Sequence, residues 1–183
     1  MLKTVRNYGL IAGAILSVMM LISLAFHEQI GFEYSAIVGY STMVLAFLMV
    51  FFGVKSYRDH EVKGDISFLR ALALGLMISL VASSCYVATW QLVYHKLAPD
   101  FVDKYADYEL RQAEKSGATE AEMVIKRQGM AGFMESYKNP LFNVAITFLE
   151  PLPVGLIFSV FSAGVLCRKR SSTRLKPTEA RPV

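Results

Sequence analysis

Four long apolar stretches constrain this chain more than any other feature of its sequence. The hydrocarbon core of a bilayer is about 30 Å thick, so a helix needs about 20 apolar residues to cross it. Apart from Arg70 and Glu150, the stretches contain no Asp, Glu, Lys or Arg. Backbone polar groups cannot stay unpaired in lipid, so each stretch should be helical. The sequence predicts an all-α, polytopic membrane protein with four transmembrane helices, over about residues 8–26, 34–54, 68–94 and 141–167.

Composition supports this class. Hydrophobic residues make up 54% of the 183 positions and charged residues 19%. A soluble protein of this size has too much surface to hide so much apolar area. The net charge of +4 comes largely from the last residues, and no stripe interleaves basic and aromatic side chains. We therefore expect lipid, and no nucleic acid, as the main partner.

Basic residues alternate between the segments that flank the spans. Lys3 and Arg6 precede the first span, the loop at 27–33 has two acids and no Lys or Arg, and the loop at 55–67 is basic again. Because basic flanking segments stay in the cytoplasm, we predict a bacterial inner-membrane protein with both termini cytoplasmic. A cleavable signal peptide is disfavoured, since the first apolar run exceeds the usual core of roughly 7–15 residues.

This topology divides the chain into two parts. Residues 1–167 form a four-helix transmembrane domain that includes an extracytoplasmic hairpin at 95–140, and residues 168–183 form a basic cytoplasmic tail with a composition typical of disorder. The tail either binds anionic lipids or only sets the topology. Arg70 is interpreted as a snorkelling anchor, or as a headgroup contact together with its basic neighbours. The candidate headgroup contacts are Lys55, Arg58, Arg70, Arg168, Lys169 and Arg170.

The segment between the third and fourth spans is amphipathic. Asp100 is placed to cap a helix from Phe101, and Gly117 suits a left-handed helix end. Thr119 and Glu122 have the spacing of a capping box, which starts a second helix. The hairpin is predicted to lie over the outer mouth of the bundle. It is either a cap that buries its apolar stripe on the bundle or on its own partner helix, or a lid or docking surface. Its apolar face is predicted from Phe101, Tyr105, Tyr108, Met123, Met130, Phe133 and Tyr137.

The fourth span contains the main candidate functional residues, Glu150, Pro151 and Pro153. The prolines remove helix donors, so a kink or break is expected. Counted from Cys167 along a straight helix, Glu150 lies about 26 Å away, near the outer edge of the hydrocarbon. Its carboxylate could accept from amides at the break or pair with His95 or Lys96. The alternatives are ion or proton handling and partner binding, because an ionisable group within a span is a candidate site.

Small residues recur at helical spacing in two spans. Gly9 and Gly13 form a Gly-x-x-x-Gly pair, and Gly75 begins a similar series with Ser79 and Ser83. Such residues let helices approach closely in lipid. The pattern predicts packing within the chain, with a homodimer as the alternative.

Catalytic and cofactor signatures are not recognisable in the sequence. No nucleophile elbow or phosphate-binding glycine loop occurs, and the three histidines do not form a metal triad. Cys85 and Cys167 fall at different depths and are interpreted as buried free thiols. We expect no enzyme activity, no metal and no cofactor.

Several ordered segments resemble a known bacterial family. They are Tyr8–Gly13, Gly39–Met43, Phe52–Asp59, Ile66–Phe68, Tyr137–Pro140 and Glu150–Leu156. Together they resemble the domain of unknown function 4199 family, over about Thr4 to Arg170. The resemblance implies a four-helix integral membrane protein with no assigned reaction and no catalytic residue.

The functional expectation is accordingly broad. The leading hypothesis is a non-enzymatic structural, assembly or accessory protein with a membrane-protein partner. The first alternative is a small transporter or channel component that uses Glu150, and the second is a membrane enzyme.

Overall fold

The computed structural model describes residues 1–167, with the side chains of residues 27–30 excepted. Helices account for most of this part of the chain, and it contains no strand. Two short π-helical segments, η1 and η2, extend α2 and α3. The elements are α1 (Leu2–Ala25), α2 (His27–Ser56), η1 (Tyr57–Glu61), α3 (Phe68–Leu92), η2 (Val93–Leu97), α4 (Phe101–Lys115), α5 (Glu120–Tyr137), α6 (Pro140–Leu149) and α7 (Leu152–Leu166).

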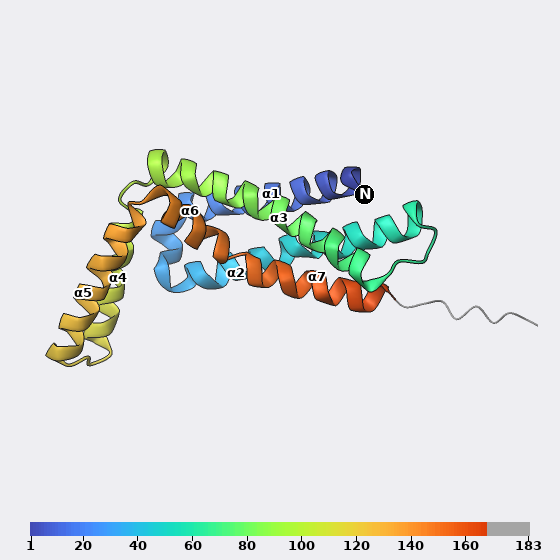
Figure 1. The fold of residues 1–183 in the computed structure, drawn as a ribbon. Coiled ribbons are helices and arrows are strands. Elements are labelled where there is room, and N and C mark those ends of the chain that lie inside the picture. The colour runs from blue at the N-terminus through green and yellow to red at the C-terminus, as the bar shows by residue number, and fades with distance from the viewer. Residues whose placement is uncertain (168–183) are drawn as a thin grey trace, which may run out of the picture.

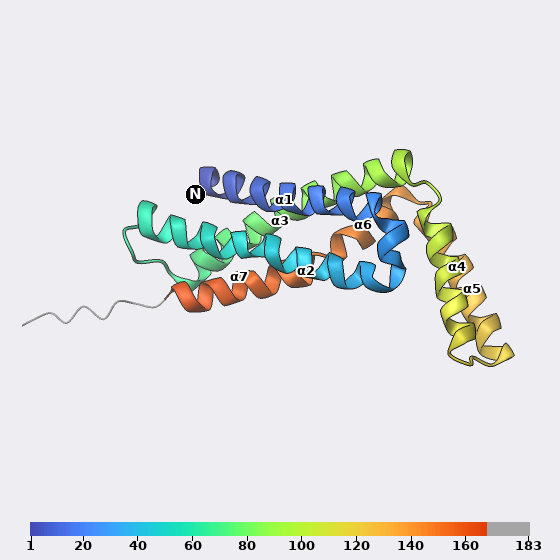
Figure 2. The same cartoon turned by 180° about the vertical axis from the view of Figure 1, so that it is seen from behind.

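Four spans form an elongated bundle, and α4 and α5 project together from one end of it (Figure 1). The view from behind shows the same arrangement (Figure 2). We call this the hairpin end, and the opposite end, which holds Met1, the N-terminal end. The helices long and apolar enough to cross a membrane are Leu2–Ala25, Gly31–Glu61, Phe68–Leu97 and Pro140–Leu166. The all-α polytopic fold class is therefore confirmed.

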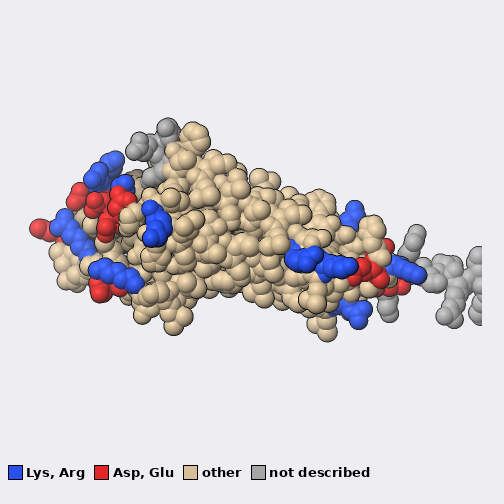
Figure 3. Space-filling model, turned by 90° about the horizontal axis from the view of Figure 1, so that it is seen from above, with Lys and Arg blue, Asp and Glu red and all other residues tan. Residues whose placement is uncertain are grey.

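Charge is distributed as a bilayer would require. Figure 3 shows Lys, Arg, Asp and Glu at the two ends, with an uncharged middle on the face in view. Large apolar side chains lie exposed along the middle, among them Leu45 on α2 and Ile157 on α7. Such a surface is costly in water and is stable against lipid tails.

The first two spans are connected more tightly than the sequence suggested. A loop was expected at 27–33, but helical structure resumes at His27, directly after Phe26. The reversal includes Gly31, whose φ of 67° and ψ of 168° break the helical path. Only glycine adopts that conformation readily, so a local backbone break replaces the predicted loop.

Small residues hold the bundle together. A Cβ atom added at Gly9 would lie 2.7 Å from Cβ of Val81, and one added at Gly13 would lie 2.6 Å from Cβ of Cys85, both on α3. A Cβ atom at Gly75 would lie 3.0 Å from Cβ of Ser159 on α7. All three glycines named from the sequence thus lie where two helices of the same chain approach closely.

The hairpin follows its sequence signals except at one position. Gly117 has a φ of 81°, and Thr119 and Glu122 form the full capping box that starts α5. Helix α4 begins at Phe101, but the side chain of Asp100 caps no amide. Its carboxylate instead lies 2.7 Å from Nζ of Lys104. The predicted cap at Asp100 is wrong because an i,i+4 ion pair takes the carboxylate.

Candidate functional site

The fourth span is broken where the sequence predicted. The Asn139 Oδ1 atom accepts from the amides of Leu141 and Phe142, at 2.9 and 3.3 Å, and so starts α6. Helix α6 ends at Leu149 and α7 begins at Leu152. Pro151 and Pro153 supply no amide donor here, so one continuous hydrogen-bonded helix cannot form. The break leaves α6 as a separate piece beside α3.

Glu150 lies at this break and faces α3. The Tyr86 hydroxyl donates to Oε2 of Glu150 at 2.9 Å. The sequence suggested that the carboxylate accepts from free amides, or pairs with His95 or Lys96, and both expectations are wrong. The side chain turns across to α3 because α6 and α3 lie side by side.

The position of Glu150 along the bundle follows from its partner. Tyr86 lies eleven residues before Leu97, where the third span ends, which corresponds to about 16 Å of helix. The third span has 30 residues, about 45 Å of helix, so the carboxylate lies about a third of the way in from the hairpin end. This is within the length of the span and beneath the hairpin.

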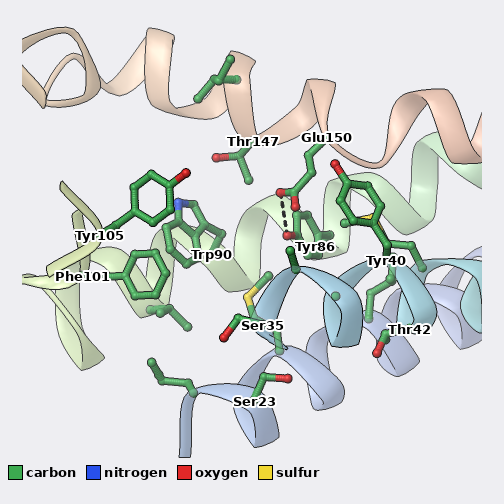
Figure 4. A pocket seen from close by; sticks show the side chains of 18 of the residues that line it. Ser23, Ser35, Tyr40, Thr42, Tyr86, Trp90, Phe101, Tyr105, Thr147 and Glu150 are labelled. Carbon is green, nitrogen blue, oxygen red and sulfur yellow. Dashed lines mark hydrogen bonds between the residues drawn. The ribbon is translucent and has the colours of Figure 1, made fainter. Parts of the chain in front are cut away.

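A cavity of about 620 Å³ opens at this level. Figure 4 shows Glu150 and Thr147 above it, Tyr86 and Trp90 behind it, Tyr40, Thr42 and Ser35 on α2, and Phe101 and Tyr105 of α4 at one side. Most of its lining is apolar, including three methionines, Met19, Met20 and Met43. A pocket of several hundred Å³ with an apolar wall and few polar groups is typical of a small-molecule site.

The cavity reaches the outer surface of the bundle. Tyr40 on α2 and Leu149 on α6 both line it, and they are 54% and 59% exposed. Since α2 and α6 also make few contacts with each other, we infer that the cavity opens sideways between them. A membrane-soluble molecule could enter by this route without crossing the hairpin.

Several hydroxyl groups in the cavity wall already donate hydrogen bonds within the protein. The hydroxyls of Ser35, Thr42 and Thr147 donate to backbone carbonyls one turn earlier in their own helices, at 2.6, 2.8 and 2.8 Å. The Trp90 indole N–H donates to the Tyr137 hydroxyl at 2.7 Å. These hydroxyls therefore have no proton left to donate to a ligand, and Glu150 is the acidic acceptor that lines the cavity.

Among the described residues that line the cavity there is no Lys, Arg or His. Glu150 also takes part in no ion pair within the described part of the chain, and its hydrogen-bond partner is the neutral Tyr86. The cavity thus combines an apolar wall with one acidic group.

The wall beside the hairpin is aromatic. Phe101 packs edge-on against Trp90, with ring centroids 5.1 Å apart. Phe32 of α2 contacts Phe101 and Tyr108 of α4, at 5.6 and 5.2 Å. The base of the hairpin therefore packs on the bundle and closes one side of the cavity, whereas the rest of the hairpin projects from the bundle and α4 packs there on α5.

Comparison with known proteins places the chain in a family. The model of the family described as protein of unknown function (DUF4199) matches residues 7–168. The chain belongs to this DUF4199 family. No curated protein and no solved structure matches it.

The remaining candidates in this DUF4199 chain lie away from the cavity. Lys55 and Arg70 are exposed at the N-terminal end of the bundle, where Arg58 pairs with Asp59 at 2.7 Å. Arg168, Lys169 and Arg170 lie outside the described residues. In the described part of the chain, no group of three His, Cys, Asp or Glu could hold a metal ion. The structure therefore separates the described basic candidates, Lys55, Arg58 and Arg70, from Glu150, Pro151 and Pro153.

Sequence reasoning missed several residues of the site. Neither Tyr86 nor Trp90 was predicted to belong to a site. Gln91 and the buried Asn143 join α3 to α6 through an amide hydrogen bond of 2.7 Å. Polar side chains inside the apolar stretches were the available signal, because buried polar groups usually have partners.

Proposed function

We propose that this DUF4199 protein is a non-enzymatic accessory protein of the bacterial cytoplasmic membrane that holds a membrane-soluble molecule in its cavity. The observation that carries the proposal is the cavity of about 620 Å³ between α1, α2, α3, α6 and the hairpin. Its wall is largely apolar, and its mouth between α2 and α6 would face lipid.

The proposal includes an orientation. With both termini in the cytoplasm, the hairpin and the nearby cavity lie in the outer half of the protein. The basic segments at the N-terminal end support this orientation. The apolar face that the hairpin turns towards the bundle supports a role as a wall of the cavity, while its charged face remains available to a membrane-protein partner.

Trp90 provides a direct test because it is the single tryptophan of the chain and lines the cavity. A nitroxide quenches indole emission on contact. We expect octadecanol with a nitroxide on the chain close to its hydroxyl group to quench Trp90 saturably when the protein is reconstituted in phosphatidylcholine nanodiscs.

Two glycines provide a matched pair of variants. Gly39 lines the cavity, and a Cβ atom there would meet nothing within 4 Å, so Gly39→Leu should fill the cavity without a clash. Gly164 has equal space but is not a lining residue. Quenching should weaken in Gly39→Leu and persist in Gly164→Leu. Equal quenching in both variants would refute a cavity-bound molecule.

A second candidate function is a transporter or channel component. The observation that favours it is the Glu150 carboxylate within the cavity, whose hydrogen-bond partner among the described residues is the neutral Tyr86 hydroxyl. Proton or cation flux into protein-containing vesicles, reduced in Glu150→Gln, would support transport. A wild-type flux equal to that of empty vesicles would remove this candidate.

A further inference from the structure

The chemistry of the cavity selects among membrane-soluble molecules. Glu150 is an acid whose partner is neutral, and the described lining residues include no basic side chain. A carboxylate in apolar surroundings has lost its hydration, and a cation that reaches it restores the lost electrostatic stabilisation. The cavity is therefore complementary to a positive charge.

Aromatic rings surround the same position. Tyr86 contacts Glu150 directly, Trp90 lies one helical turn further along α3, and Figure 4 shows Tyr40 reaching from α2 towards Glu150. The faces of tyrosine and tryptophan rings attract cations, and ammonium groups are a usual ligand of such sites. A carboxylate and three aromatic rings together suit an ammonium group better than a hydroxyl group.

We propose that the cavity binds an amphipathic amine, with its ammonium group at Glu150 among Tyr40, Tyr86 and Trp90, and its apolar body along the methionine-lined wall. This inference rests on the proposed function and specifies its ligand. Met19, Met20 and Met43 are flexible and polarisable, so this wall adapts to chains or rings of different shape.

Other lipids fit the same cavity less well. A fatty acid would place a second carboxylate beside Glu150. A phosphatidylethanolamine headgroup carries a phosphate next to its ammonium, and the described lining residues offer no basic partner for that phosphate. The ligand is thus a free amine with a net positive charge.

The test compares three probes that share one chain. Octadecylamine, octadecanol and octadecanoate, each with a nitroxide on the chain close to its polar end, are titrated against Trp90 emission in phosphatidylcholine nanodiscs at neutral pH. The amine should bind about tenfold more tightly than the alcohol, as expected for one charge-assisted contact, and the carboxylate should bind least.

Glu150→Gln tests the effect of the negative charge alone on ligand affinity, because it keeps the size of the side chain and an oxygen acceptor for Tyr86. In this variant amine affinity should fall about tenfold, to that of the alcohol, while alcohol affinity stays unchanged. Equal affinity for amine and alcohol in the wild type, or an unchanged amine preference in Glu150→Gln, would overturn the amine proposal.

Two further experiments distinguish a failure of the amine proposal from a failure of the proposed function. If Gly39→Leu weakens quenching by the alcohol but no amine preference exists, the cavity binds lipid-like molecules and only the amine proposal fails. If Gly39→Leu weakens the quenching of Trp90 by neither the amine nor the alcohol, both the amine proposal and the proposed function fail. Unlabelled phosphatidylethanolamine added to the nanodiscs should not displace the amine, and displacement would instead assign the site to that headgroup.

Discussion

The hydroxyl of Tyr86 and the carboxylate of Glu150 form a hydrogen bond of 2.9 Å across 64 positions of the sequence. It joins the part of α3 nearer the hairpin end to the break between α6 and α7. Both side chains line the cavity, so the same contact fixes the break and places an acidic group in the cavity wall.

Tyr86→Phe tests the energetic value of this contact, because it removes the donor and keeps the ring. We expect a loss of about 1 kcal/mol of stability, since hydrogen bonds to charged groups contribute somewhat more than neutral ones but this one faces an open cavity. The measurement is unfolding of the reconstituted protein by denaturant. The same substitution in a Glu150→Gln background should cost less, and an equal cost in both backgrounds would show that the two residues are not coupled.

The close approach of α3 and α7 predicts a strong effect at Gly75. A leucine there would drive its side chain against both the Cβ atom and the backbone of Ser159, so we expect Gly75→Leu to destabilise the bundle by about 1–3 kcal/mol. Gly164→Leu is the control, because its added Cβ atom meets nothing within 4 Å. Thermal unfolding in detergent compares the two, and matching midpoints would contradict the packing described for these helices.

The proposed orientation predicts which surface positions face the outside of a cell. In a chain with both native cysteines replaced by alanine, Glu120→Cys on the hairpin should react with a membrane-impermeant maleimide in intact cells. Asp65→Cys, at the N-terminal end, should react only after the cells are permeabilised. Both positions are exposed, so access to the reagent decides the outcome. The reverse labelling pattern would place the termini outside.

The capping box predicts a pH dependence for the start of α5. The Thr119 backbone N–H and hydroxyl donate to Glu122, and these hydrogen bonds lower the pKa of its carboxyl below the ordinary value of 4.5. A lowered folded-state pKa stabilises the helix above pH 4.5, and this contribution is lost as the pH falls through the lowered value. Amide hydrogen exchange at the start of α5, corrected for its intrinsic pH dependence, should therefore show less protection in acid. Thr119→Ala should show reduced protection already at neutral pH, and full protection there would contradict the cap.

Local features of this fold could be predicted from the sequence because each depends on a few neighbouring residues. The four spans follow from apolar length, the break from Pro151 and Pro153, and the start of α5 from Thr119 and Glu122. Family membership was likewise evident from ordered segments distributed along the chain.

The candidate site could be predicted only in part, because it depends on how separate helices meet. Glu150 was recognised as an acid within a span, but its partner Tyr86 belongs to another helix. The cavity arises because α6 and α2 stay apart while the hairpin closes one side. Such spacing depends on helix angles and on contacts such as Gln91 with Asn143, which no local pattern encodes.

The most direct measurement of the central claim is native mass spectrometry of the protein extracted from its own membrane. The account predicts a bound small molecule that remains on the wild-type protein and on Gly164→Leu, and that is lost from Gly39→Leu, where leucine fills the cavity. A bound mass retained equally by Gly39→Leu, or wild-type protein that carries no bound molecule, would contradict the claim that this cavity holds a membrane-soluble molecule.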